Sequence, residues 1–296
     1  MLEKRKSICE KCYLYERVRG NHRCPVFGIY LKQEQSNPAA NCEKWNGMET
    51  KILFNKTLDL TNQFIGQKCF LLCNGPSRDD FNLALLKGPG IATMTINNGG
   101  NDFRSTFWTC QDEAYKFMDS IWRDPTIMKF TSTKNSKGAT PDGKSLAYCP
   151  NIYYHKRASC HELKDWFIKD SISWNTTKEC ANVRSTMLAA IHILYVLGFR
   201  EIYIVGADFK MSKTNKYCFA QDRSEGEIKQ NNHSYECINK WFELMKDQFS
   251  ERGLHVFKCG GGVNVPFIDY NDAIKNCLID TSPSTEGMYS SKSIRN

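Results

Sequence analysis

The stretch that most constrains this chain is residues 68–77, KCFLLCNGPS, where a short apolar run stops at Asn-Gly-Pro-Ser. Residues 70–72 suit a buried parallel strand, which Gly75 and Pro76 cannot continue, and Ser77 can cap a helix that follows. Such a turn leaves backbone N–H groups free beside a helix N-terminus, where phosphate or another anion binds. An ordinary strand exit is the alternative, so other stretches must decide.

The composition sets the class of protein. A chain of 296 residues can hold one α/β domain of about 200 to 250 residues and a small additional unit. Hydrophobic residues make up 41% and charged residues 24%, as in ordinary soluble proteins. No apolar run approaches the roughly 20 residues that cross a bilayer, and no secretory signal is visible, so we expect no membrane insertion and a cytoplasmic location, the host cytoplasm if the chain is viral. The formal charge of +8 favours a polyanionic partner without naming it.

Four of the fourteen cysteines lie before residue 50: Cys9, Cys12, Cys24 and Cys42. The C-x2-C spacing of the first pair lets two thiolates meet one zinc ion, and the other two can complete a four-thiolate site. The segment is rich in turns and poor in large apolar side chains, and so small a unit usually needs a metal to fold. We therefore predict a structural Zn²⁺ module over residues 1–50, with unrelated reduced cysteines or an iron–sulfur cluster as alternatives. The basic residues around the first pair indicate either contact with a nucleic-acid backbone or a solvated charged face.

Further strands end in small polar groups. Residues 91–96 and 107–109 predict two more strands, and the first is followed by Asn97 and Asn98. The spacing of apolar residues over 183–197 predicts a helix that ends at Gly198, and residues 201–205 predict a buried strand that leads to Asp208. Ligands of open parallel sheets bind beyond the carboxyl ends of the strands, so these exits would face one crevice. Asp208 could bind a ribose, position a loop, touch a metal or cap the turn.

The order of these elements predicts the domain organisation. It indicates a Rossmann-like, doubly wound, mostly parallel α/β sheet over residues 51–280, followed by a disordered tail over residues 281–296. Residues 210–230 predict a polar loop over the crevice, and a helix is expected from Tyr235 to about Arg252, with a final strand at 254–258. His233 would stand at the start of that helix, accessible and titratable near neutral pH, which makes it the best candidate for a general base.

Four motifs in this order resemble the bacterial sialyltransferases of the Campylobacter type: NGPS after the first strand, RSTMLAAIHILYVLGFREIYIVGADF, a loop with KYCF, and NNHSY. The resemblance covers about residues 68–265. It implies a single Rossmann-like domain that transfers a sugar from CMP-sialic acid with inversion and without a metal. It also implies that His233 deprotonates the acceptor hydroxyl, that Tyr217 steadies the donor phosphate, and that Ser185 lies near the cytosine or the sugar carboxylate. The donor-nucleotide site would then be formed by Asn74, Gly75, Pro76, Ser77, Asn97, Asn98, Ser185, Asp208, Lys210 and Tyr217.

Two features depart from that family. Lys210 stands where the family has a second phosphate-binding tyrosine, which is a different chemistry, and the cysteine-rich N-terminal segment is foreign to the family.

From the resemblance we predict an inverting glycosyltransferase with a CMP- or UDP-sugar donor. Its expected acceptor is a hydroxylated or hydroxymethylated pyrimidine in DNA, as in phages that shield their genomes. The alternatives are a sialyltransferase-like enzyme acting on a surface glycan, an enzyme like the pterin diphosphokinases, and a non-enzymatic nucleic-acid-binding module.

Overall fold

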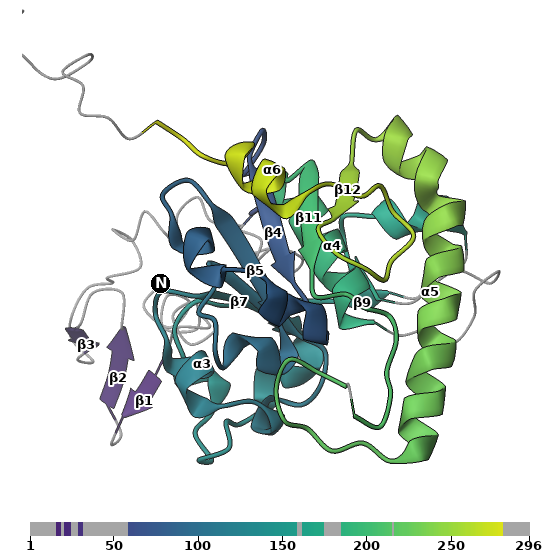
Figure 1. Cartoon of the computed structure of the whole chain (residues 1–296). Helices are drawn as coiled ribbons and strands as arrows, with labels where there is room; N and C mark the ends of the chain where they lie inside the picture. Colours follow the sequence, from purple (N-terminus) through teal and green to yellow (C-terminus); the bar gives the residue numbers. More distant parts are fainter. Residues whose placement is uncertain are drawn as a thin grey trace, which may run out of the picture. The chain divides into compact units, whose positions relative to one another are not determined.

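The computed structural model describes residues 59–158, 162–174, 185–214 and 216–280, together with the backbone of three short strands nearer the N-terminus (Figure 1). By its internal contacts the chain divides into two units, Met1–Asp59 and Leu60–Asn296. The expected boundary after residue 50 stays a prediction, and the expected tail, residues 281–296, lies outside the described residues.

The first unit contains a three-stranded antiparallel sheet in the order β1-β2-β3, formed by β1 (Glu16–Val18), β2 (Asn21–Cys24) and β3 (Ile29–Leu31). Cys24 ends β2 and pairs with Ile29. Cys9, Cys12 and Cys42 lie outside the described residues. The zinc module therefore stays a prediction.

The second unit is built on a seven-stranded sheet in the order β12-β11-β4-β5-β6-β7-β8, in which every neighbouring pair is parallel. This confirms the predicted mostly parallel α/β fold. The strands are β4 (Lys68–Leu72), β5 (Ala92–Ile96), β6 (Phe107–Cys110), β7 (Met128–Ser132), β8 (Ile152–His155), β11 (Glu201–Val205) and β12 (His255–Lys258). A separate parallel pair joins β9 (Arg157–Ala158) to β10 (Ile172–Ser173).

The order of the strands determines where a ligand can bind. From β4 the chain builds the sheet outward through β5 to β8, then returns to the other side of β4 to add β11 and β12. The order therefore reverses between β4 and β11. Open α/β sheets bind ligands at such a switch point, beyond the carboxyl ends of the strands.

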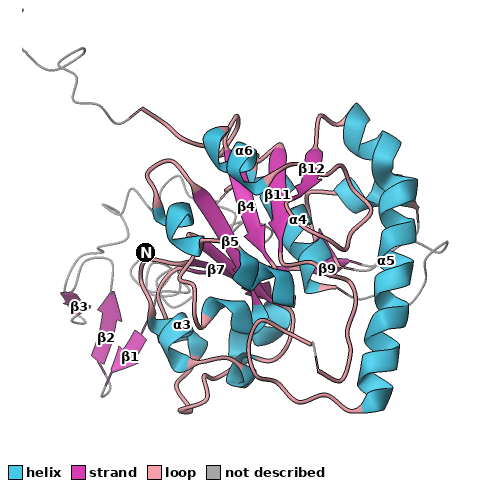
Figure 2. Cartoon of the chain, in the orientation of Figure 1, coloured by secondary structure: helices cyan, strands magenta, loops and turns pink. Residues whose placement is uncertain are grey.

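Helices and short turns pack around the strands (Figure 2). The described helices are α3 (Asp119–Arg123), α4 (Thr186–Leu197), α5 (Glu225–Glu251) and α6 (Tyr270–Lys275), and 3₁₀ turns occupy Pro76–Asp80, Leu83–Lys87, Asn97–Gly100, Ala114–Lys116, Thr133–Lys137, Leu146–Tyr148 and Leu163–Phe167. Helix α4 is buried from Met187 onward and ends, as predicted, at Gly198, whose φ of 111° suits glycine. No helix in the described ranges is long and apolar enough to cross a membrane.

Helix α5 begins ten residues earlier than predicted. A capping box starts it at Glu225, because the Ser224 hydroxyl accepts a hydrogen bond from the Glu227 N–H (3.3 Å) and the Glu227 carboxylate accepts one from the Ser224 N–H (2.8 Å). The expected start at Tyr235 and the expected loop through residue 230 are therefore wrong. The expected position of His233 at the start of the helix is also wrong, because His233 lies about two turns inside α5. Apolar periodicity marks only the second half of α5, where Trp241 and Phe249 pack on Trp166.

Candidate functional site

At the switch point the Asn-Gly-Pro-Ser turn is bound by the protein's own groups. The Gly75 N–H donates a hydrogen bond to the Gly206 carbonyl (2.6 Å), and the Ser77 N–H donates one to Asp208 Oδ2 (3.1 Å). A Cβ on Gly75 would overlap Asp208 Oδ2, so glycine is required at this close approach. The sequence predicted that backbone N–H groups of this turn would be free to bind a phosphate. The Ser77 N–H is not free, because it is hydrogen-bonded to the Asp208 carboxylate.

The turn differs from the sequence expectation in one further respect. Pro76 is the first residue of the 3₁₀ turn Pro76–Asp80, and Gly75, which has no side chain, occupies the capping position. The expected capping by Ser77 is wrong. Its hydroxyl is buried and has no hydrogen-bond partner in the part of the chain that the structure describes.

A buried cation lies behind this turn. Arg78 is fully buried, its Nη2 pairs with Asp102 Oδ1 at 2.5 Å, and its Nη1 lies 3.5 Å from the Gly99 carbonyl oxygen. A Cβ on Gly99 would overlap Asn74 Oδ1 and lie 2.8 Å from Arg78 Nη1, so Gly99 packs closely against both side chains. Arg78 thus joins the exit of β4 to the turn that follows β5.

Two asparagines predicted for the donor site lie at these exits. Asn74 Nδ2 donates to the Ile96 carbonyl (3.3 Å), and Asn97 Nδ2 donates to Thr186 Oγ1 (3.3 Å). Asn97 has a φ of 48°, a left-handed conformation that asparagine tolerates better than most residues. The Oδ1 atoms of both side chains are buried and find no hydrogen-bond donor among the described residues. Buried acceptors without donors are rare, and a bound ligand would satisfy them.

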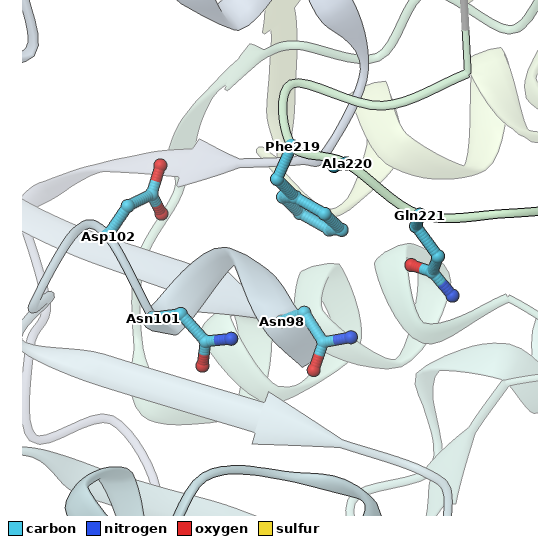
Figure 3. Close-up of a pocket in the computed structure, with 6 residues that line it drawn as sticks. All are labelled: Asn98, Asn101, Asp102, Phe219, Ala220 and Gln221. Atoms are coloured by element: carbon cyan, nitrogen blue, oxygen red, sulfur yellow. The ribbon is translucent and has the colours of Figure 1, made fainter.

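Beside them lies a hollow of about 210 Å³, shown in Figure 3. Its lining comes from the turn after β5 and from the loop after β11: Asn98, Asn101, Asp102, Phe219, Ala220 and Gln221. The loop is tied to the strand exit because the Cys218 N–H donates to the Asn74 carbonyl (2.9 Å). Tyr217 stacks on Phe219, with ring centroids 5.4 Å apart and planes 10° apart.

His233 lies on α5, the helix that follows the loop carrying Tyr217 and Phe219. It is exposed on α5, its Nε2 is 3.8 Å from Cys237 Sγ, and it lines a second hollow, of about 490 Å³, with Lys213, Glu225, Ile228, Lys229, Asn232 and Glu236. Among the residues that the structure describes, none lines both hollows. Tyr235 follows His233 by two residues, about 200° around the helix, and stacks on Phe209 (4.9 Å). Burial raises the pKa of Tyr235 to about 12, and the charges of Tyr217 and Cys73 act in the same direction. The strand-exit side of α5 is thus the Tyr235 side, and His233 points away from it.

The remaining predicted residues have separate positions. Ser185 caps α4, since its hydroxyl accepts from the Met187 N–H (3.2 Å). Lys210 is exposed and follows Phe209, whose φ is 49°. The structure therefore brings together the residues at the exits of β4, β5 and β11 with the loop that carries Tyr217. Ser185 lies next to Thr186, which accepts the Asn97 amide, whereas Lys210 and His233 make no hydrogen bond, ion pair or ring contact with these residues in the part of the chain that the structure describes. No cluster of three or more His, Cys, Asp or Glu side chains able to hold a metal occurs in the described ranges.

Sequence reasoning missed several residues of this site, notably Arg78, Asp102, Phe219 and Gln221. Arg78 had a weak signal, because it directly follows the phosphate-type turn. Phe219 belongs to the KYCF motif, although no role was predicted for it there. Asp102 and Gln221 had no signal, since only the fold brings the β5 exit next to the loop after β11.

No protein-family model matches the sequence, and no curated protein matches it. Among solved structures the chain is similar to the MAf glycosyltransferase from Magnetospirillum magneticum AMB-1, with 13% identity and a TM-score of 0.43 over 70% of this chain and 35% of that one. It is also similar to the sialyltransferase CstII from Campylobacter jejuni in complex with CMP-3FNeuAc (13% identity, TM-score 0.41, 74% of this chain and 96% of that one) and to the sialyltransferase CST-II in complex with a trisaccharide acceptor and CMP (15%, 0.40, 74% and 98%). The chain thus spans about a third of the first protein and nearly all of the other two. At these values the similarity assigns no residue and no activity to this chain.

Proposed function

We propose that the chain is an inverting glycosyltransferase that uses a nucleotide sugar. The observation that carries this proposal is the group of buried polar atoms without partners in the described chain, Asn74 Oδ1, Asn97 Oδ1 and Ser77 Oγ, at the exits of β4 and β5. They lie at the carboxyl edge of a parallel sheet, beside its switch point, where nucleotides bind in open α/β folds. The ribose hydroxyls and the base of a donor nucleotide would supply the missing donors.

The proposed chemistry needs stabilisation of the departing phosphate and a base for the acceptor proton. Lys210 and Tyr217 are proposed for the phosphate. The donor site is further proposed to include Asn98, Ser185 and the turn Gly75, Pro76 and Ser77. Because Asp208 already holds the Ser77 N–H, its proposed role is to fix the shape of this turn. Side chains of the site, and not that N–H, would then contact the phosphate.

His233 stays the proposed base. Because its side chain faces away from the strand exits, this role requires that substrate binding brings the imidazole within hydrogen-bond reach of the acceptor hydroxyl. The loop that carries Lys213 into the His233 hollow also carries Phe219 into the other hollow. An extended acceptor that lay along this loop would pass both hollows. A DNA strand fits this requirement and the formal charge of +8, so we propose a hydroxylated or hydroxymethylated pyrimidine in DNA as the acceptor and the cytoplasm as the place of the reaction.

The transfer reaction tests this proposal directly. The full chain is incubated with a panel of CMP- and UDP-sugars and with hydroxymethylated DNA, unmodified DNA or a lactose-type glycan. The products are digested and weighed by mass spectrometry. A sugar added only to the hydroxymethylated base supports the proposal. A sugar added to the glycan alone would move the acceptor to a surface glycan, and no product with any donor would contradict glycosyl transfer.

The role of His233 has its own test. His233→Ala should lower turnover by about 10²- to 10⁴-fold, because that is what a general base typically contributes, with nucleotide affinity unchanged. The matched control is His255→Ala, which removes another exposed histidine, at the start of β12. Full activity in His233→Ala would exclude the imidazole as the base.

We also propose that Cys9, Cys12, Cys24 and Cys42 hold a structural Zn²⁺ ion. Elemental analysis of the purified chain should then find about one zinc per chain, and Cys12→Ser should lose it, because four thiolates complete a tetrahedral site. Cys149→Ser, which removes a half-buried thiol of the second unit, should keep the metal. A metal-free wild-type chain purified without chelators would contradict the zinc site.

A further inference from the structure

We infer that the hollow between the turn after β5 and the loop after β11 is a nucleobase-binding site (Figure 3). The inference rests on the proposed function, since it states which part of a nucleotide or nucleic-acid substrate this edge of the sheet recognises. Asn98 and Tyr217 were expected in the donor site from the sequence, whereas no role was expected for Asn101, Asp102, Phe219 and Gln221.

The first observation is a stack of flat side chains that ends at the hollow. The guanidinium of Arg223 lies over the Tyr217 ring, 5.7 Å from its centroid, and Tyr217 is stacked nearly parallel on Phe219, which lines the hollow. Cys218, the residue between Tyr217 and Phe219 in the sequence, donates its N–H to the Asn74 carbonyl at the exit of β4. Phe219 is therefore held in place before any ligand arrives. Every nucleobase has a π-face that can extend such a stack.

The second observation is the set of polar groups around the ring. Figure 3 shows Phe219 over the turn that carries Asn98 and Asn101, with Asp102 on one side and Gln221 on the other. The three side-chain amides each offer donors and acceptors, and within the described residues none of them hydrogen-bonds another residue. A base edge also alternates donors and acceptors. The hollow can therefore bind both the face and the edge of a base.

The third observation is the charge. Asp102 is the charged residue in the lining, and its Oδ1 is fixed at 2.5 Å by the buried guanidinium of Arg78. A carboxylate repels phosphate, so a nucleotide would place its base here and its phosphate outside. It also accepts hydrogen bonds and donates none. We therefore expect bases with an exocyclic amino group to bind more tightly than uracil or thymine.

Such a base can come from two sources, the nucleotide of the sugar donor or a pyrimidine turned out of the DNA acceptor. Binding titrations of the full chain separate them, with nucleoside 5′-monophosphates in one arm and a short single-stranded DNA containing one hydroxymethylated pyrimidine in the other. Phe219→Leu keeps an apolar side chain and removes the stack, and Phe219→Trp restores it. Tyr115→Leu, at a ring that is 61% exposed outside the hollow, is the matched control.

Phe219→Leu should weaken binding about tenfold, with Phe219→Trp and Tyr115→Leu close to the wild type. A loss for mononucleotides assigns the hollow to the donor base, and a loss for the oligomer alone assigns it to the acceptor base. If Phe219→Leu does not fold, as judged by its melting temperature, Gln221→Ala replaces it, with an expected loss of about threefold. Wild-type binding of both ligands by the folded variant would overturn the inference.

The two proposals fail separately, because these titrations need no turnover. If nucleotide binding depends on Phe219 but no sugar is transferred to any acceptor, the proposed function is contradicted and the nucleobase site is supported. If sugar is transferred but nucleotide and DNA binding do not depend on Phe219, the proposed function is supported and the nucleobase site is contradicted. A simple sugar phosphate that competed as well as a nucleotide would show that the hollow takes a sugar ring, which also overturns the inference.

Discussion

Gly75 allows the Asn-Gly-Pro-Ser turn to pack closely against the residues that follow β11. A Cβ there would overlap Asp208 Oδ2 and lie 2.6 Å from the Gly206 carbonyl oxygen. Gly75→Ala should therefore lower the free energy of unfolding by about 1–3 kcal/mol, because the turn must open against its own hydrogen bonds. Chemical denaturation measures this. Gly261→Ala, with no atom within 4 Å of the added methyl, is the control and should change stability little. Equal effects of the two substitutions would show that the turn adjusts freely.

The Arg78–Asp102 pair should respond unequally to loss of either partner. Asp102 is half exposed and can be solvated alone, whereas Arg78 is fully buried and cannot. Asp102→Asn should therefore destabilise the protein by about 1–3 kcal/mol, and Arg78→Met, which keeps most of the buried volume, should cost less. The double variant should be more stable than Asp102→Asn alone, since it no longer buries an uncompensated cation. The measurement is the melting temperature of the three variants. If Arg78→Met is less stable than Asp102→Asn, Arg78 contributes mainly through its packing.

Among the elements, α5 depends on its N-terminal cap. Its first ten residues are mostly polar and exposed, so local hydrogen bonds must hold them. Ser224→Ala removes the acceptor of the Glu227 N–H and should cost about 0.5–2 kcal/mol of stability, measured by urea unfolding. Ser250→Ala, at an exposed serine near the end of the same helix, should have almost no effect. If both variants unfold at the same urea concentration as the wild type, the cap contributes nothing to global stability.

The elements also show how far the sequence could predict this fold. Strands β4, β5, β6, β11 and β12 were predicted because each is rich in apolar or β-branched residues and lies next to a turn signal. Strands β7 and β8 were not, since they lie in a stretch of scattered aromatic, Lys and Ser residues without a sustained period. Lys129 lies fully buried in β7, and its ammonium group donates to the carbonyls of Asp124 (2.6 Å) and Ile127 (2.9 Å). Such internal partners exist only in the folded chain, so hydropathy alone reads the segment as exposed.

The same limit holds for the candidate site. Asn74, Asn97 and Asn98 were predicted because polar residues directly after buried strands are visible in the sequence. The Asp208 carboxylate and the Ser77 N–H belong to residues 131 positions apart, and no local sequence pattern predicts their contact. The start of α5 is different. Its S-x-x-E signal was present in residues 224–227, and the prediction failed because it followed apolar periodicity, which begins only near Ile238.

For the whole molecule, two buried histidines predict how stability depends on pH. His155 and His192 are fully buried, and burial lowers the pKa of His155 to about 4 and that of His192 to about 3, in the latter case with a smaller effect from the charge of His155. In the unfolded chain both would titrate near 6.5. The unfolded state therefore binds protons first as the pH falls. The stability that the neutral histidines contribute is complete above about pH 6.5 and is lost toward pH 4, by up to about 1.4 kcal/mol per pH unit for each group.

The measurement is the free energy of unfolding at pH 7, 6 and 5, above the range where most carboxylates titrate. His192→Asn is the informative variant, because an asparagine oxygen can replace His192 Nδ1 as the acceptor for the Ser173 N–H (2.9 Å) and cannot be protonated in this range. It should reduce the pH dependence by about half. His255→Gln, at an exposed histidine, should leave the dependence as in the wild type. A His192→Asn chain that loses stability with pH as steeply as the wild type would show that neutral, buried histidines do not govern the acid response, and that groups elsewhere in the molecule do.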